Sequence, residues 1–176
     1  LGRSAAPNIA KAMSATQRTI LWFRNDLRLH DNALFHHPAA AAVERKELLC
    51  AYCADPAIFS GRLKQTGLPK VGAIRSKFIR ECVQDLRSSL RRLGGDLLVA
   101  PAKPEVWLPQ LAQVELGKKA GAVVVVVAQG VTPEEQQDEM VVEAALAALP
   151  TPAHLARVWG LSLYHIEDLP YRDIRK

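Results

Sequence analysis

Five valines follow one another in Ala122-Val-Val-Val-Val-Val-Ala128, the longest purely apolar stretch of this 176-residue chain. β-Branched side chains lose rotamer freedom in a helix and pack well on a pleated sheet, so the run predicts a strand. Because apolar and polar residues do not alternate, both faces should be buried, as in a parallel sheet. We therefore expect 122–127 to be the central strand of an α/β domain. The stretch is far shorter than the roughly 20 residues that span a bilayer.

Similar segments occur on both sides of this run. The other expected strands are Thr19–Phe23, Leu48–Tyr52, Asp96–Ala100 and Ala153–Trp159. Helical patterns are expected at 31–45 (interrupted by Pro38), 75–93, 104–114 and 132–149. Strands separated by such segments indicate right-handed βαβ crossovers. The predicted fold is a three-layer, Rossmann-like α/β domain with a parallel sheet of about five strands and helices on both faces.

Local signals set the ends of two helices. In 75–93 apolar residues that include Phe78 and Leu93 recur at steps of three and four, which predicts one buried face. Gly94-Gly95 follows and supplies the positive φ with which helices commonly end. Thr132-Pro-Glu-Glu135 predicts a capping box, with Glu134 and Glu135 as helix-start charges.

Composition excludes several classes of protein. Hydrophobic residues make up 49% and charged residues 23% of the chain, which is typical of a folded globular domain. Three cysteines leave an odd thiol after any pairing, so a reducing compartment is expected rather than a secreted disulfide scaffold. The net charge of +5 permits an anionic partner without requiring one. A group of cations around the helix at 75–93 comprises Lys64, Lys70, Arg75, Lys77, Arg80, Arg87, Arg91 and Arg92. A solvated face is favoured over a nucleic-acid surface, because no aromatic residues are interleaved for stacking.

Common catalytic and cofactor motifs are absent from the sequence. It has no Gly-x-Gly-x-x-Gly after the first strand, no P-loop and no Gly-x-Ser-x-Gly elbow. Cys50 and Cys53 should point to opposite faces of their strand, which favours core cysteines over a redox or metal pair. Histidine spacings typical of metal sites are also missing, so surface or capping roles are expected for His36 and His37.

The two ends of the chain differ from the part between them. Residues 1–18 contain Arg, Lys and Ser but no acidic residue, and the chain begins at Leu1. Two interpretations stay open, the stub of an organelle transit peptide and a linker remnant. The domain is expected to cover 19–168, and 169–176 to be the start of a linker or tail.

The loop after the first strand has the sequence Trp22-Phe-Arg-Asn-Asp-Leu-Arg-Leu-His-Asp-Asn32, which resembles the opening signature of the photolyase/cryptochrome family. The resemblance continues through Tyr52-Cys-Ala-Asp-Pro56, residues 69–86 and 103–105, and Trp159-Gly-Leu-Ser-Leu-Tyr-His165. The first and last of these are most similar to DASH-type cryptochromes. The resemblance implies the N-terminal, antenna-type α/β domain of that family.

The resemblance also implies cofactors. In the family this domain carries or borders an antenna chromophore, usually methenyltetrahydrofolate, and a following helical domain holds FAD and receives damaged DNA. Cys53 and Asp55 are the implied folate-pocket residues. Ala54 and Ala57 replace an aromatic residue and an arginine of the DASH pattern, and Gly130 stands where the family often has a Glu that contacts the pterin ring. Because glycine cannot make that charge-assisted contact, we expect no cofactor in this chain, with methenyltetrahydrofolate as the alternative and FAD only alongside a helical domain.

Five polar residues of the signature are assigned to a partner or interdomain loop: Arg24, Asp26, Arg28, Asp31 and Asn32. They are expected to pair with one another, to cap the next helix and to brace the loop against a neighbouring domain, because no nucleophile lies beside them. No catalytic residue and no metal ligand is assigned.

Two functions remain open at this level. The favoured one is a domain that is not catalytic on its own, a degenerate antenna domain used as an accessory or protein-interaction subunit. Its protein partner, or a missing helical domain, would lie beyond the carboxyl ends of the strands. The alternative is part of a DASH-type blue-light photoreceptor or DNA photolyase with folate and FAD; nucleic acid is not expected to bind this domain alone. The expected location is an organelle, chloroplast before mitochondrion, with cytoplasm or nucleus as the alternative.

Overall fold

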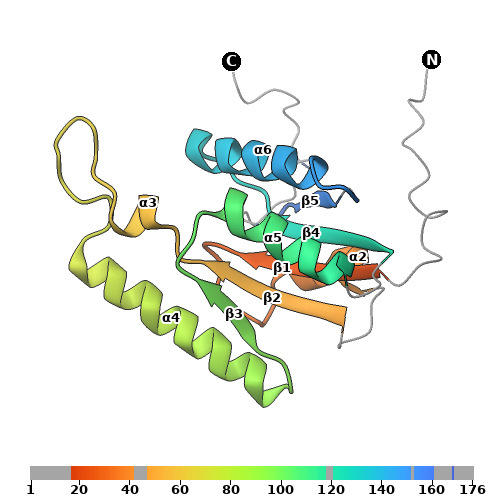
Figure 1. Ribbon diagram of the computed structural model, residues 1–176. Helices are drawn as coiled ribbons and strands as arrows, with labels where there is room; N and C mark the ends of the chain where they lie inside the picture. The colour runs from red at the N-terminus through yellow and green to blue at the C-terminus, as the bar shows by residue number, and fades with distance from the viewer. Residues whose placement is uncertain (1–16, 42–46, 118–120, 152, 161–167, 169–176) are drawn as a thin grey trace.

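The computed structural model describes residues 17–41, 47–117, 121–151, 153–160 and 168 (Figure 1). Five parallel strands form one sheet in the order β3-β2-β1-β4-β5, which confirms the predicted fold class. The strands are β1 Gln17–Phe23, β2 Leu48–Cys53, β3 Leu97–Ala100, β4 Ala122–Ala128 and β5 His154–Val158. Residues 1–16 of the expected transit-peptide or linker stub, the tail at 169–176 and 161–165 of the last family pattern lie outside the described residues. Gln17 and Arg18, expected in the stub, belong to β1 and pair with β4.

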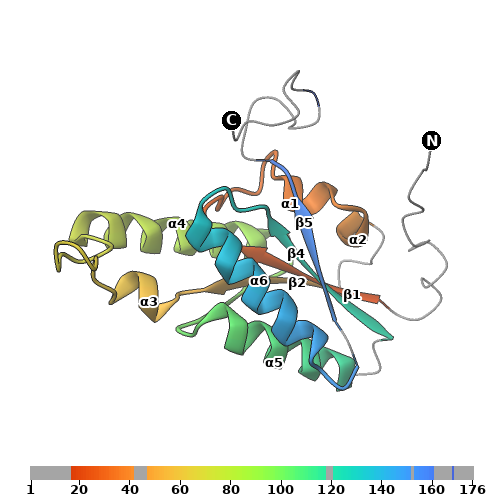
Figure 2. The same cartoon turned by 90° about the horizontal axis from the view of Figure 1, so that it is seen from above.

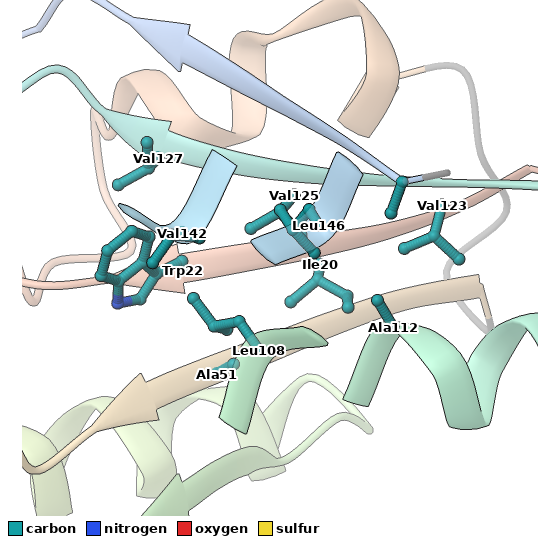
Figure 3. Close-up of a cluster of buried hydrophobic side chains, with 11 residues drawn as sticks. Ile20, Trp22, Ala51, Leu108, Ala112, Val123, Val125, Val127, Val142 and Leu146 are labelled. Carbon is teal, nitrogen blue, oxygen red and sulfur yellow. The ribbon is translucent and has the colours of Figure 1, made fainter. Parts of the chain in front are cut away.

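Helices cover both faces of the sheet (Figure 2). One face is covered by α1 Ala33–His36, α2 Pro38–Ala41 and α4 Ala73–Arg92, and the other by α5 Pro104–Gly117 and α6 Pro133–Ala147. A hydrophobic cluster lies on each face of the sheet, and the side chains of β1 alternate between the two clusters. Ile20 and Trp22 belong to the cluster under α5 and α6, and Leu21 and Phe23 belong to the cluster under α1, α2 and α4. Figure 3 shows the first cluster, with Trp22 among valines of β4 and residues of α5 and α6. Burial of each large apolar side chain contributes about 1.5–3 kcal/mol.

The valine strand is interior but not central, which corrects the expectation. β1 occupies the middle position, because Leu21 is in register with Cys50 of β2 on one side and with Val126 of β4 on the other. The chain builds β2 and β3 on one side of β1 and then crosses to the other side for β4 and β5. β4 has a neighbour on each side all the same, and this accounts for its apolar character on both faces.

Helix ends follow the predicted local chemistry. The Thr132 hydroxyl accepts a hydrogen bond from the Glu135 N–H, and the Glu135 carboxylate accepts one from the Thr132 N–H, which confirms the capping box. Gly94 follows α4 with a φ of 84°. The break at Pro38 is also confirmed, and His37 Nδ1 accepts a hydrogen bond from the Ala39 N–H at the start of α2. No helix among the described residues is long and apolar enough to cross a membrane.

The predicted apolar face of α4 is only partly buried. Val83, Leu86 and Leu90 pack on the sheet, but Phe78 and Leu93 are each 64% exposed. The 20-residue helix is about 30 Å long, whereas the neighbouring four-residue β3 covers about 13 Å, so the first turns of α4 extend past the strands (Figure 1). The expectation of a cation group without an interleaved aromatic residue is therefore wrong at Phe78.

Several of those cations have carboxylate partners. Arg87 and Arg91 both bind Asp96, Lys70 lies 3.3 Å from Glu134, and Lys77 lies 3.8 Å from Glu81. Half of the group is thus paired within the protein, which supports the interpretation as a solvated helix face.

Candidate functional site

The crevice of this fold lies where β1 and β4 are neighbours. The connection after β1 leads to helices on one face of the sheet, and the connection after β4 leads to α6 on the other. Ligands of open α/β sheets bind outside the carboxyl ends of strands at such a point. Four residues meet there, Arg24 after β1, Gly130 after β4, Glu139 of α6 and Arg157 of β5, and we call them the switch-point cluster.

Glu139 is the centre of this cluster. It lies on the core-facing stripe of α6 with Val142 and Leu146, and its side chain is only 3% exposed. Oε1 accepts hydrogen bonds from Arg24 at 2.5 Å and from the Gly130 N–H at 2.6 Å, and Oε2 accepts one from Arg157 Nε at 2.8 Å. Three charge-assisted donors therefore satisfy the buried carboxylate.

Arg24 ties three elements together. Its Nη2 donates to the Ala128 carbonyl at 2.5 Å as well as to Glu139, and its Nη1 donates to the Glu135 carbonyl at 3.4 Å. The guanidinium carbon also lies 4.9 Å from the ring centre of Trp22, a cation–π distance. Arg24 thus points inward to α6, which corrects the expectation that it pairs within its own loop.

Arg157 extends the cluster to the surface. Its Nη2 donates to the half-exposed Glu143 at 2.9 Å. This hydrogen bond from Arg157 lowers the pKa of Glu143, and Glu143 and then Glu139 raise the pKa of Arg157. α6 and the edge strand β5 are held together by this pair.

Gly130 has no room for a side chain. A Cβ at this position would lie 2.4 Å from Glu135 Cβ and 2.9 Å from Glu139 Oε1. Real Cβ atoms essentially never approach so closely, and the Glu135 main chain, 3.2 Å away, belongs to the capped first turn of α6. The glycine therefore allows its N–H to reach the buried carboxylate.

Glu135 closes the outer rim of the cluster. Burial alone would raise its pKa, but hydrogen bonds from Thr132, Asn25 and Val131 outweigh this effect and lower the pKa. Glu134 beside it is exposed and pairs with Lys70. Both predictions of helix-start charges are confirmed.

The signature loop behaves in part as predicted. Asp26 accepts two hydrogen bonds from the Arg28 guanidinium, at 2.8 and 3.0 Å, and this raises the pKa of Arg28. Asn32 caps α1 through a 3.0 Å bond from the Leu34 N–H and donates to the Arg28 carbonyl. Asp31 has a φ of 51° and turns the chain. Pairing and capping are thus confirmed for Asp26, Arg28 and Asn32, whereas contact with a neighbouring domain stays a prediction.

Cys53 and Asp55 lie at the end of β2, beside α3 Pro56–Phe59, a single turn that the sequence analysis did not predict. Asp55 caps that turn by accepting a 2.8 Å hydrogen bond from the Ala57 N–H. Burial, then Asp55 and Glu105, raises the pKa of Cys53 to about 12, so its thiol is neutral. Cys50 packs on the opposite face of the sheet, as predicted. Within the described ranges, no three His, Cys, Asp or Glu side chains are placed to hold a metal ion.

A shallow groove of about 380 Å³ lies beside the signature loop. Residues 27–30 form one wall, and Asp85, Leu86 and Ser89 of α4 form the other. It is separate from Cys53, Asp55 and the switch-point cluster. Glu139 and Arg157 were missed by the motif search, although a Glu on the apolar stripe 139, 142, 146 is a signal of a buried ion pair.

Similarity to known proteins assigns this chain to a family. The sequence profile of DNA photolyase matches residues 19–175. The chain belongs to the DNA photolyase family. The solved structure of a Synechocystis cryptochrome has a TM-score of 0.75 and 33% identity to this family member, over 89% of this chain and 30% of that one.

Cryptochrome DASH proteins are similar to this photolyase-family chain in sequence. The protein of Gloeobacter violaceus is 40% identical, with 89% of this chain and 29% of that protein covered. The Oryza sativa subsp. japonica protein, named chloroplastic/mitochondrial, is 36% identical, with 86% and 27% covered. The likeness to DASH-type cryptochromes is confirmed, and the chain spans less than a third of the length of these relatives.

Proposed function

We propose that this photolyase-family domain acts as an accessory, protein-docking module and has no photochemistry of its own. The observation that carries the proposal is an exposed apolar group at the start of α4. Ile74 is 88% and Phe78 64% exposed, and Leu68 of the preceding loop is 60% exposed. Ile74 and Phe78 are four residues apart and share one face of the helix.

The chemistry of this group suits a protein partner. Arg75 and Lys77 flank the two apolar residues, and Glu81 and Asp85 continue their stripe towards the groove beside the signature loop. Burial of one such apolar side chain contributes about 1.5–3 kcal/mol, and exposed apolar patches rimmed by charge mark interaction sites. A partner helix with apolar residues and charges of both signs fits this surface.

A second function is favoured by the identity of 36–40% to cryptochrome DASH proteins over most of the chain. In that alternative these residues are one part of a DASH-type photoreceptor or photolyase, with methenyltetrahydrofolate and FAD, and the apolar group contacts its helical domain. For either function we propose an organelle location, chloroplast before mitochondrion, because the rice relative is named chloroplastic/mitochondrial.

The two functions separate in one experiment on the protein isolated from its own cells. Size-exclusion chromatography with light scattering should give a defined complex without visible absorption, and a photo-cross-linker at position 78 should capture one partner. The double change Ile74→Ser and Phe78→Ser should dissociate the complex, whereas Met140→Ser, at a 60% exposed position of α6, should not. A free protein that holds stoichiometric flavin and splits pyrimidine dimers under light overturns the docking proposal.

A further inference from the structure

We infer that the loop after β4 is closed around Glu139 and cannot recognise the pterin ring of a folate chromophore. Recognition in the family, as the resemblance implies, uses a carboxylate at position 130 against a pair of ring N–H groups. In this chain position 130 is a glycine, and the buried Glu139 carboxylate accepts hydrogen bonds from the Gly130 N–H, from Arg24 and from Arg157. This inference is independent of the docking proposal, since a protein partner can bind α4 whether or not a folate binds.

The first observation is the lack of space at residue 130. Any side chain would begin 2.4 Å from Glu135 Cβ, and Glu135 is fixed by its capping box and by a 2.5 Å hydrogen bond from Asn25. A side chain at position 130 therefore requires a shift of the loop, of the first turn of α6 or of the buried Glu139. Position 130 thus lacks both the carboxylate of the family pattern and the space for one.

The second observation is that the donors facing Glu139 are already used, although Arg24 Nε is buried without a hydrogen-bond partner among the described residues. Arg24, the Gly130 N–H and Arg157 all donate to Glu139, and the remaining Arg24 hydrogen bonds go to the carbonyls of Ala128 and Glu135. A ligand would have to displace a buried ion pair to reach them, which leaves charges unpaired.

The third observation concerns the carboxylates nearby. Glu135 is held in its cap, and one oxygen of Asp55 caps α3. Asp138 is half-buried, and burial followed by the charge of Asp55 raises its pKa. The residues present do not fit the pterin, although Cys53 and Asp55 match the family pattern.

The test is a titration of the 176-residue chain with methenyltetrahydrofolate, followed by absorption and by equilibrium dialysis. Neither the wild-type chain nor Gly130→Glu should give saturable binding. Gly130→Ala should lower the Tm by several degrees, whereas Gly72→Ala, where a Cβ meets no atom within 4 Å, should not. In the NMR spectrum the Gly130 amide proton should be shifted downfield and protected from exchange, and Glu139→Gln should reduce both effects.

Stoichiometric folate binding by the wild-type chain overturns the inference, as does binding gained by Gly130→Glu. An unshifted, rapidly exchanging Gly130 amide also overturns it, because the loop would then be open. If Gly130→Glu does not fold, the alanine variant and the amide signal still decide the question. Loss of the partner complex in the preceding experiment leaves all of these results unchanged.

Discussion

Two carboxylates in this domain each bind two arginines, and they differ in burial. Glu139 holds Arg24 and Arg157 with 3% of its side chain exposed, whereas Asp96 holds Arg87 and Arg91 with 41% exposed. The Asp96 contacts span 2.7–3.1 Å, and those at Glu139 are shorter on the whole, at 2.5–2.8 Å. Burial separates the two groups further, because solvent screens the charges around Asp96 much more than those around Glu139.

The groups also differ in what they connect. Asp96 joins the end of α4 to the start of β3, five to nine residues apart in the chain. Glu139 joins α6 to the loop after β1, 115 residues away, and to β5. The buried group therefore connects three elements that are distant in sequence, whereas the exposed group supports one local connection.

Glu139→Gln should give the largest effect, because it leaves Arg24 and Arg157 without their buried counter-charge. We expect the free energy of unfolding to fall by about 3–5 kcal/mol, measured by urea denaturation. Glu143→Gln is the matched control at the exposed rim of the same cluster and should cost at most about 1 kcal/mol. Equal losses in the two variants would remove the distinction between buried and exposed pairs.

Arg24→Lys separates charge from hydrogen-bond geometry at the buried group, because it keeps the positive charge and removes the planar guanidinium with its several donors. A lysine ammonium cannot reach Glu139 and the carbonyls of Ala128 and Glu135 in the same way. Leaving a buried acceptor without its donor should lower the free energy of unfolding by about 1–3 kcal/mol in the same assay. Wild-type stability in this variant would mean that charge alone, without hydrogen-bond geometry, holds the cluster.

Much of the buried cluster was open to prediction from periodicity. Alternation along β1 places Ile20, Trp22 and Arg24 on one face, and Leu155 and Arg157 of β5 share that face. Glu139 lies on the inward stripe of α6. When each apolar pattern is extended by one position, it includes a charged residue, and the three residues Arg24, Glu139 and Arg157 meet at the crevice. The sequence motif alone assigns Arg24 to its own loop.

Other features depend on arrangement that local sequence does not encode. The valine run indicates a strand buried on both faces, but the middle position of β1 follows from the crossover after β3. The steps of three and four in α4 predict one buried face, but only the packing of the helix on the sheet decides that Ile79 faces the core and that Phe78 is exposed. The tight contact at Gly130 needs the position of Glu135 in space.

Asp96→Asn tests the exposed group. Asp96→Asn should lower the Tm less than Glu139→Gln or Arg24→Lys does. The decrease in Tm caused by Asp96→Asn should become smaller between 0.1 M and 1 M salt, because the Debye length falls from about 10 Å to about 3 Å. The loss caused by Glu139→Gln should persist at both salt concentrations. A salt-independent loss at Asp96 would show that its hydrogen bonds, not its charge, carry the stabilisation.

The smallest expected effect is the change with pH in the stability difference between the wild type and Asp96→Asn, and its direction follows from the pKa of Asp96. Hydrogen bonds from Arg87 and then Arg91 hold the pKa of Asp96 well below its usual range. The unfolded chain therefore binds a proton at higher pH than the folded one, so the contribution of Asp96 is complete above the unfolded pKa and is lost as pH falls through the folded pKa. The stability difference between wild type and Asp96→Asn should be constant above about pH 5 and decrease in more acidic solution, followed by chemical denaturation at each pH. A difference that increases towards acid would mean that the arginines do not favour the ionised carboxylate, and the likeness of the two arginine-bound carboxylates would then be one of shape only.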